Sequence, residues 1–175
     1  LGKKIYSKEK LDMLLIKRAR VSKDSINRIP VAIKIIKNEK NKKTIVFTES
    51  ISHADAICKK LTDKGYNASA YHTGISKNIR NLNLSEFYEG SCRILVTCTA
   101  LDEGLNVPDI EVAVIVSQTM SFRQRIQRIG RALRRGKKKA KIYTIYITDD
   151  EKNILIQEFA NLHDISNFKW LKTEL

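Results

Sequence analysis

The feature that most constrains the fold of this chain is a regular alternation of short β-branched and aromatic runs with longer amphipathic segments. The predicted strands cover residues 44–48, 66–71, 93–97, 111–116 and 141–148. Strands that alternate with helices imply right-handed crossovers and a parallel sheet that helices cover on both faces. The pattern therefore predicts an α/β protein.

Signals for the start and the end of helices lie between these strands. The predicted N-caps are Ser50 or Ser52, Ser76, Ser121, and Asp149 or Asp150, and the predicted stops are Gly65 and Gly90. Residues 7–38 also have a helical pattern, in which Pro30 is expected to begin a second segment. In a parallel sheet, ligands bind at the carboxyl ends of strands, which here means the loops after Phe47, Tyr71, Val96 and Val116.

Length and charge narrow the possible partners. The 175 residues suffice for one domain with a hydrophobic core. Lys and Arg number 33 against 19 Asp and Glu, a net charge of +14, which points first to nucleic acid and second to an anionic membrane. No apolar run approaches the roughly 20 residues that span a bilayer, and no secretory signal is recognisable. We expect a cytoplasmic or nucleoid-associated protein without a membrane partner.

The cysteines and histidines give no support for a disulfide framework or a metal site. Cys58, Cys92 and Cys98 are odd in number and contain no C-x-x-C pair. The histidines, His53, His72 and His163, are scattered along the chain. We expect reduced cysteines and no metal bound by this chain.

The segment 122–135 carries five arginines within eleven residues, from Arg125 to Arg135. At about 100° per residue, apolar residues fall on one side, whereas Gln127, Arg131 and Arg134 cluster on another. One face can then pack on a core while the other presents guanidinium groups that match phosphate oxygens. The alternative is a solvated basic helix face, which leaves Gly130 unexplained, since Gly inside a helix costs roughly 1 kcal/mol relative to Ala.

Other loops offer weaker signals. The loop 48–50 combines hydroxyls with a helix N-terminus, which can hold an anion, although Ser and Thr are also ordinary caps. The turn 72–74 contains Gly74, which permits close backbone approach, although a plain turn with a cap at Ser76 is the favoured explanation for this segment alone. Asp102 and Glu103 are adjacent and so would not face each other as an acid and base pair.

The parts of a self-sufficient nucleotide hydrolase are missing from the sequence. The P-loop pattern G-x-x-x-x-G-K-[ST] does not occur, and no strand ends in a D-E-x-D or D-E-x-H run. A G-x-S-x-G nucleophile elbow is absent as well. The chain can contribute arginines to a triphosphate but cannot bind and cleave one well by itself. This suggests one of two domains that together form a nucleotide-hydrolysing site.

Three blocks of this sequence together resemble the second RecA-like domain of superfamily 2 helicases and translocases. Residues 45–50 (IVFTES) resemble motif IV, residues 95–109 (LVTCTALDEGLNVPD) resemble motif V, and residues 127–134 (QRIGRALR) resemble motif VI. The resemblance covers roughly residues 43–148. Its motif V is closer to DNA translocases of the restriction-enzyme and repair type than to DEAD-box RNA helicases.

This resemblance implies a three-layer RecA-like (P-loop NTPase-like) fold with a central parallel sheet of five or six strands flanked by helices. Residues 1–42 would be a helical lead-in from a first RecA-like domain, residues 43–165 the helicase C-terminal domain, and residues 166–175 a tail. ATP with Mg²⁺ would be bound mainly by the first domain. The implied partners are that domain and nucleic acid, DNA rather than RNA.

The resemblance also implies roles for individual residues. Arg131 and Arg134 would be the arginine fingers on the γ-phosphate. The residues expected near ATP or at the domain interface are Gln127, Arg128, Gly104 and Asn106. The residues expected on the nucleic-acid backbone are Thr48, Ser50, Thr73 and Thr99. Two positions depart from the family pattern: Cys98-Thr99 stands where many relatives have Thr-Asp, and Asn106 stands where Asp is common.

The resulting prediction is the C-terminal motor domain of an ATP-dependent superfamily 2 DNA helicase or translocase, inactive as an isolated domain. The alternative is a stand-alone basic module that binds nucleic acid without ATP. That module would explain the charge but not the Gln and Gly placed among the arginines. An independent enzyme for a phosphorylated small molecule is disfavoured by the missing P-loop and the lack of a credible base.

Overall fold

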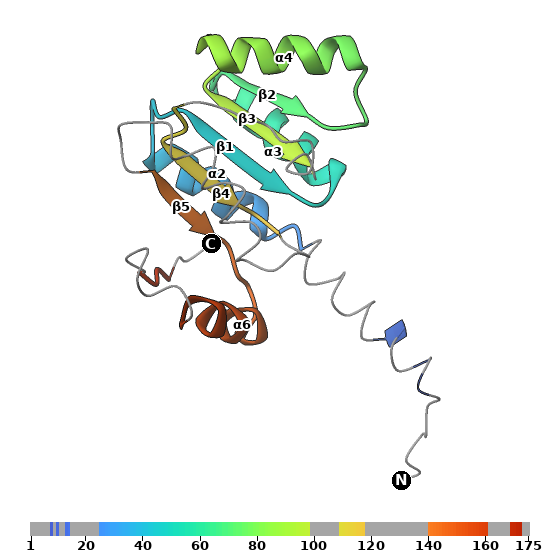
Figure 1. Cartoon of the computed structure of the whole chain (residues 1–175), viewed down its shortest axis with the longest axis vertical. Coiled ribbons are helices and arrows are strands. Elements are labelled where there is room, and N and C mark those ends of the chain that lie inside the picture. The colour runs from blue at the N-terminus through green and yellow to red at the C-terminus, as the bar shows by residue number, and fades with distance from the viewer. Residues whose placement is uncertain are drawn as a thin grey trace.

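The centre of the molecule is a parallel sheet in the strand order β2-β3-β1-β4-β5 (Figure 1). The computed structural model describes residues 25–98, 109–117, 140–160 and 169–172, together with Lys8, Lys10, Met13 and Leu14. The strands are β1 (Thr44–Thr48), β2 (Ala68–Tyr71), β3 (Ile94–Cys98), β4 (Val112–Ile115) and β5 (Lys141–Thr144). Every pairing among them is parallel, which confirms the predicted sheet.

Helices cover both faces of this sheet, as predicted. The described helices are α2 (Arg28–Asn38), α3 (Ile51–Thr62), α4 (Lys77–Glu89) and α6 (Asp149–Ala160). Ile45 and Phe47 of β1 pack in one core cluster with residues of α4 and α6, whereas Val46 packs in a second cluster with residues of α2 and α3. Because both faces are buried, the strands are apolar at successive positions instead of alternating. The result is the three-layer α/β architecture.

The ends of α4 follow the signals read from the sequence. Ser76 is the N-cap, and its Oγ accepts a hydrogen bond from the Ile79 amide at 3.4 Å. Gly90 closes the helix at φ 87°, a left-handed conformation that glycine adopts without steric cost. Both predictions are confirmed.

The N-terminal caps of α3 and α6 differ in part from the caps predicted from the sequence. Ser50 stands at the N-cap of α3, but its Oγ hydrogen-bonds to Ser52 Oγ at 2.6 Å and makes no capping bond. In α6 the capping oxygen belongs to Thr148, whose Oγ1 accepts from the Glu151 amide at 3.2 Å. Asp149 is instead the first helical residue, where its negative charge favours the helix N-terminus.

Two predicted boundaries were wrong by a few residues. α2 begins at Arg28, so Pro30 lies in its first turn instead of starting the segment. Proline is tolerated there because first-turn amides have no acceptor within the helix. β5 ends at Thr144, four residues short of the prediction, because its neighbour β4 ends at Ile115 and offers little further pairing. The ladder closes with the Ile145 amide on the Ile115 carbonyl at 2.9 Å.

Arg28 is a buried cation that joins several elements. Its side chain is 2% exposed, and Nη1 donates to the Val116 carbonyl at 3.0 Å and to the Ile145 carbonyl at 2.8 Å. Nη2 forms an ion pair with Glu151 of α6. The first turn of α2 is thereby fixed to the ends of β4 and β5, so part of the predicted lead-in packs on the sheet.

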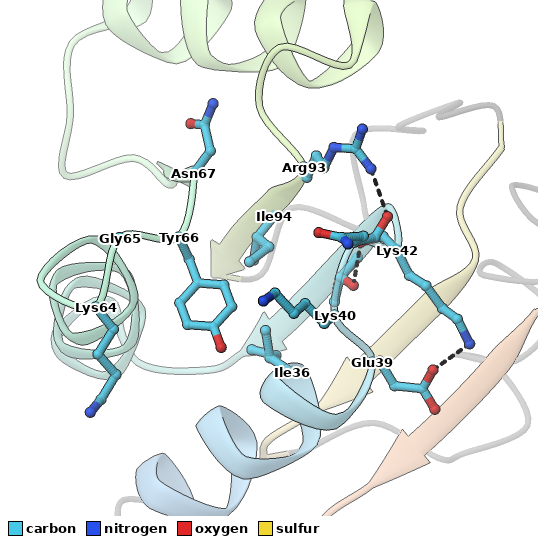
Figure 2. A pocket seen from close by; sticks show the side chains of 12 residues that line it. Ile36, Glu39, Lys40, Lys42, Lys64, Gly65, Tyr66, Asn67, Arg93 and Ile94 are labelled. Carbon is cyan, nitrogen blue, oxygen red and sulfur yellow. Dashed lines mark hydrogen bonds and ion pairs between the residues drawn. The ribbon is translucent and has the colours of Figure 1, made fainter.

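A second polar network fixes the other end of α2, and Figure 2 shows its contact between Glu39 and Lys42. Glu39 is 6% exposed and accepts hydrogen bonds from Lys141 Nζ at 2.7 Å, Tyr143 Oη at 2.5 Å and Lys42 Nζ at 2.5 Å. Burial alone would raise the pKa of Glu39, but these three donors outweigh it and lower the pKa from 4.5 to about 2. Burial, together with the Glu39 carboxylate, raises the pKa of Tyr143 to about 12. Glu39 is therefore a carboxylate that ties α2 to β5.

Candidate functional site

The candidate site lies at the carboxyl ends of the strands, where the predicted loops meet. The parallel register places Thr48 of β1 beside Cys98 of β3, and Tyr71 of β2 beside Thr97. These strands therefore end at one edge of the sheet. The register confirms that the carboxyl ends of β1, β2 and β3 are neighbours in space.

The loop after β1 is fixed by hydrogen bonds to both neighbouring strands. Thr48 is 3% exposed, and its Oγ1 donates to the Ser50 carbonyl at 3.0 Å and lies 3.4 Å from the Thr97 carbonyl. The Glu49 amide donates to Ser117 Oγ, after β4, at 3.2 Å. The Thr48 side chain thus braces the loop, while Ser50 is partly exposed. Of the two predicted contacts here, only Ser50 offers a hydroxyl to an outside ligand.

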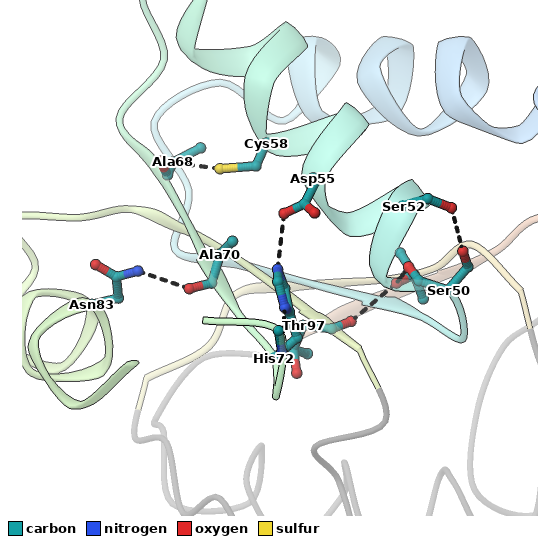
Figure 3. A network of polar contacts seen from close by, with 11 residues as sticks. Ser50, Ser52, Asp55, Cys58, Ala68, Ala70, His72, Asn83 and Thr97 are labelled. Carbon is teal, nitrogen blue, oxygen red and sulfur yellow. Dashed lines mark hydrogen bonds and ion pairs between the residues drawn. The ribbon is translucent and has the colours of Figure 1, made fainter. Parts of the chain in front are cut away.

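The turn after β2 is held by a chain of three residues (Figure 3). His72 Nδ1 accepts a hydrogen bond from the Gly74 amide at 3.2 Å, and Nε2 lies 2.9 Å from Asp55 Oδ1. An imidazole that accepts at Nδ1 carries its proton on Nε2, so Nε2 donates to the carboxylate. The His72 ring is 2% exposed, whereas Thr73 is exposed. The buried ring therefore orients the turn that presents Thr73.

Gly74 is required by this arrangement for a steric reason. A Cβ at position 74 would lie 3.0 Å from His72 Nδ1, 3.2 Å from its Cε1 and 3.3 Å from Ile51 Cγ2. The first distance is closer than side chains tolerate without a shift. The sequence indicated that this glycine permits close approach to the backbone, and the close neighbour in the structure is the histidine ring.

The Thr97 hydroxyl is a further polar group at this edge. Its residue is 0% exposed, and Oγ1 has no hydrogen-bond partner among the residues that the structure describes. Buried hydroxyls are normally satisfied, so this oxygen is an exception among the described residues.

Several predicted site residues lie outside the described part of the chain. They are Thr99, Gly104, Asn106, Gln127, Arg128, Arg131 and Arg134. Within the described residues, no group of three or more His, Cys, Asp or Glu side chains could hold a metal ion. No described helix is long and apolar enough to cross a membrane.

Sequence reasoning missed the pairing of Asp55 with His72. The two residues are 17 positions apart, and no local pattern connects them. They meet because α3 packs against β2, which brings an exposed turn of the helix over the end of the strand. A signal was present only in the order of elements, since the turn after β2 must pass close to α3.

The family follows from a comparison with known protein families. Residues 27–136 match the family described as helicase conserved C-terminal domain. This chain belongs to that family. The match begins within one residue of α2 and includes the three blocks identified as motifs IV, V and VI. It makes this chain the C-terminal domain of a superfamily 2 helicase, as the sequence predicted.

Relatives of this helicase C-terminal domain include proteins of two types. The DNA 3'-5' translocase XPB2 of Sulfurisphaera tokodaii is 33% identical over 125 residues, covering 71% of this chain and 27% of that protein. The DEAD-box ATP-dependent RNA helicase 5 of Arabidopsis thaliana is 33% identical over 102 residues, covering 58% and 19%. This chain thus spans less than a third of either relative.

Solved structures agree on the fold of this domain. The C-terminal domain of the DEAD-box protein Dbp5 matches with a TM-score of 0.68 at 23% identity, over 82% of this chain and 83% of that one. The Hef helicase domain of Pyrococcus furiosus matches with a TM-score of 0.56 at 25% identity, over 85% and 31%. The predicted RecA-like fold of helicase C-terminal domains is confirmed.

Proposed function

We propose that this helicase C-terminal domain is the second motor domain of an ATP-dependent superfamily 2 DNA helicase or translocase. The observation that carries the proposal is the family match across residues 27–136, on a parallel sheet whose strands β1, β2 and β3 end at one edge. The sequence lacks a P-loop and a magnesium carboxylate run. A first RecA-like domain of the same protein would supply both and hold ATP with Mg²⁺, and the complete protein would work in the cytoplasm or on the nucleoid.

In this proposal the arginine-rich segment completes the hydrolytic site. Arg131 and Arg134 would stabilise the charge that develops on the transferred phosphoryl group, a contribution worth about 10³–10⁵ in rate. Gln127 and Arg128 would connect the state of the nucleotide to the domain interface. Gly104 and Asn106 would line the same cleft from the loop after β3. None of these roles requires a base in this domain.

The nucleic-acid strand would run along the carboxyl edge of the sheet. Ser50 and Thr73 are the described candidates with exposed surface there, and Thr99, which lies outside the described residues, would contact the strand as well. Thr48 would position this loop and would not contact the strand directly, because its hydroxyl faces the carbonyls of Ser50 and Thr97. A net charge of +14 favours a polyanionic track. The form of motif V and the likeness to a DNA translocase support DNA over RNA.

The test is to replace Arg131→Ala or Arg134→Ala in the full-length protein and to measure DNA-stimulated ATP hydrolysis. We expect kcat to fall by about 10³-fold or more, as for other arginine fingers, while affinity for DNA changes by no more than a few-fold. Lys60→Ala is the control because it removes one exposed cation from α3, away from the predicted sites. Undiminished hydrolysis in both arginine variants would exclude the finger assignment.

A stand-alone nucleic-acid-binding module is the alternative that the charge supports. Such a module would bind strands with a steep salt dependence and would be indifferent to nucleotide. Measuring strand affinity of the full-length protein with ADP and with a non-hydrolysable ATP analogue separates the two functions. A motor requires the two affinities to differ, and a simple binding module requires them to be equal.

A further inference from the structure

A pocket of about 360 Å³ opens at the amino edge of the sheet, opposite the edge of the candidate site (Figure 2). It is formed where three segments enter the sheet: the turn between α2 and β1, the turn before β2, and the start of β3. Its volume falls within the range of pockets that bind small molecules, about 300–1,000 Å³. Nothing in the proposed motor mechanism uses this edge.

Four of the twelve residues that line the pocket are cations. Lys40, Lys42, Lys64 and Arg93 line it, and Glu39 is the one carboxylate among its lining residues. Glu39 is already bound by Lys42, Lys141 and Tyr143, so its charge is compensated from within the protein. The pocket therefore keeps an excess of positive charge that this carboxylate does not neutralise.

Several donors in the pocket have no partner of their own. Among the residues that the structure describes, the ammonium groups of Lys40 and Lys64 and the hydroxyl of Tyr66 have no hydrogen-bond or ion-pair partner. The nearby acid Asp63 is held by Lys59 at 3.0 Å. Glu111 accepts a hydrogen bond from the Lys43 amide at 3.1 Å. Lys40 and Tyr66 thus direct unpartnered donors toward a cavity whose neighbouring acids are engaged, while Lys64 stands at its rim with its ammonium pointing away from the cavity (Figure 2).

The walls of the pocket are fixed in place. Arg93 Nη1 donates to the Asn41 carbonyl at 2.7 Å, which joins the turn before β1 to the start of β3. Asn41 holds a left-handed conformation at φ 66°, which asparagine tolerates better than most residues. The amide of Asn67 donates to the Ser91 carbonyl. These contacts pre-form the cavity, so a ligand would not have to order it.

The interior of the pocket differs from its rim. Ile36 and Ile94, which are 2% and 5% exposed, form an apolar base, and the Tyr66 ring lies beside them (Figure 2). The cations stand around this base on exposed or half-exposed positions. An apolar base with a cationic rim suits a compact molecule that combines several negative charges with an apolar or aromatic part.

We infer that this amino-edge pocket is a binding site for a phosphate-bearing anion, separate from the predicted ATP-binding edge. Phosphate groups suit it better than a single carboxylate because they supply more charge and more acceptor oxygens for the cationic rim and the Tyr66 hydroxyl. The phosphates could belong to a free phosphorylated molecule or to the backbone of a nucleic-acid strand. The inference goes beyond the proposed motor function and does not depend on it.

The test compares two double variants of the 175-residue chain. Lys40→Gln with Lys64→Gln removes two of the pocket cations, whereas Lys37→Gln with Lys60→Gln removes the same charge from exposed positions one helical turn earlier in sequence. Affinity is measured by calorimetry with inorganic pyrophosphate in one arm and a short oligothymidylate in the other. Amide NMR signals of Gly65 and Asn67 report binding in the pocket, and those of Ser50 and Gly74 report binding at the opposite edge.

We expect the pocket variant to lose about tenfold or more in affinity for pyrophosphate, while the matched control changes by less than about twofold. If only the oligothymidylate shows this difference, the strand backbone is the source of the phosphates and the site stands. Equal losses in both double variants would show general charge attraction and overturn the inference. Shifts confined to Ser50 and Gly74 would overturn it as well. Tyr66→Phe offers a milder second variant if the double variant fails to fold.

Discussion

At the scale of single residues, the turn after β2 depends on a glycine that leaves room for a histidine. Replacing Gly74→Ala places a methyl group 3.0 Å from His72 Nδ1, so the ring must move and its hydrogen bond to the turn weakens. We expect a loss of about 1 kcal/mol or more in the free energy of unfolding, measured by urea denaturation.

The cause of that loss can be isolated with a double-mutant cycle. In a His72→Ala background the ring is gone, so most of the cost of Gly74→Ala should disappear. Gly65→Asn provides a contrasting control, because Gly65 has φ 77° and no atom within 4 Å of an added Cβ. It should be tolerated, since asparagine adopts left-handed conformations. An undiminished cost in the His72→Ala background would contradict the steric explanation.

Some residue-scale features follow from sequence and others do not. Ser76 and Gly90 were predictable because a cap satisfies backbone groups only a few positions away. The partnership of Asp55 with His72 was not, because it depends on how α3 lies over β2. The predicted hydroxyl contact of Thr48 illustrates the same limit: the residue type was visible, but the direction of its side chain was not.

At the scale of elements, Arg28 holds α2 against the ends of β4 and β5. The substitution Arg28→Met removes the guanidinium group. The carbonyls of Val116 and Ile145 and the Glu151 carboxylate then lose the donor that Arg28 provided. We expect a loss on the order of 2–4 kcal/mol in the free energy of unfolding, measured by chemical denaturation. Lys37→Met, at an exposed position of the same helix, should change stability by about 0.5 kcal/mol or less. A similarly small effect at Arg28 would show that α2 is held by its apolar contacts alone.

Element types were predictable because β-branched runs and helical periodicity are local signals. The residues at which the elements begin and end were less predictable. β5 continues in sequence as Ile145-Tyr146-Ile147, which has the composition of a strand, but β4 ends at Ile115 and its last hydrogen bond to this segment comes from the Ile145 amide. The start of α2 was predicted wrongly for a related reason. Arg28, its first residue, hydrogen-bonds to the carbonyls of Val116 and Ile145, which are distant in sequence and which no local pattern reveals.

At the scale of the whole molecule, Glu39 makes the free energy of unfolding depend on pH in the acid range. The folded-state pKa of Glu39 is about 2 against an ordinary value of 4.5. A depressed pKa contributes stability above about pH 4.5, and this contribution is lost as pH falls toward 2. The shift corresponds to at most about 3 kcal/mol, and solvent around the exposed Lys141 reduces this figure.

Glu39→Gln should therefore flatten the fall of stability between pH 4.5 and 2, measured by denaturation at a series of pH values. Asp63→Asn is a suitable comparison because its surface ion pair with Lys59 contributes little. Parallel stability curves for the wild type and Glu39→Gln would contradict the assigned role of this network.

The overall architecture was the most predictable level, because strands alternating with helices admit few arrangements. The edge that carries the candidate site was chosen from topology alone. The amino-edge pocket was not foreseen, since its cations come from three segments, at Lys40 and Lys42, at Lys64 and at Arg93. Each of these cations looks like ordinary surface charge until the sheet assembles.

The strand order also bears on synthesis by the ribosome. β1 pairs with β3 and β4 but not with β2, which directly follows it in the chain. During synthesis, β1 can therefore first pair with another strand when β3, residues 94–98, has left the exit tunnel. A nascent polypeptide that is shorter carries Ile45, Val46 and Phe47 without a strand beside them, and such exposed apolar segments are what chaperones bind.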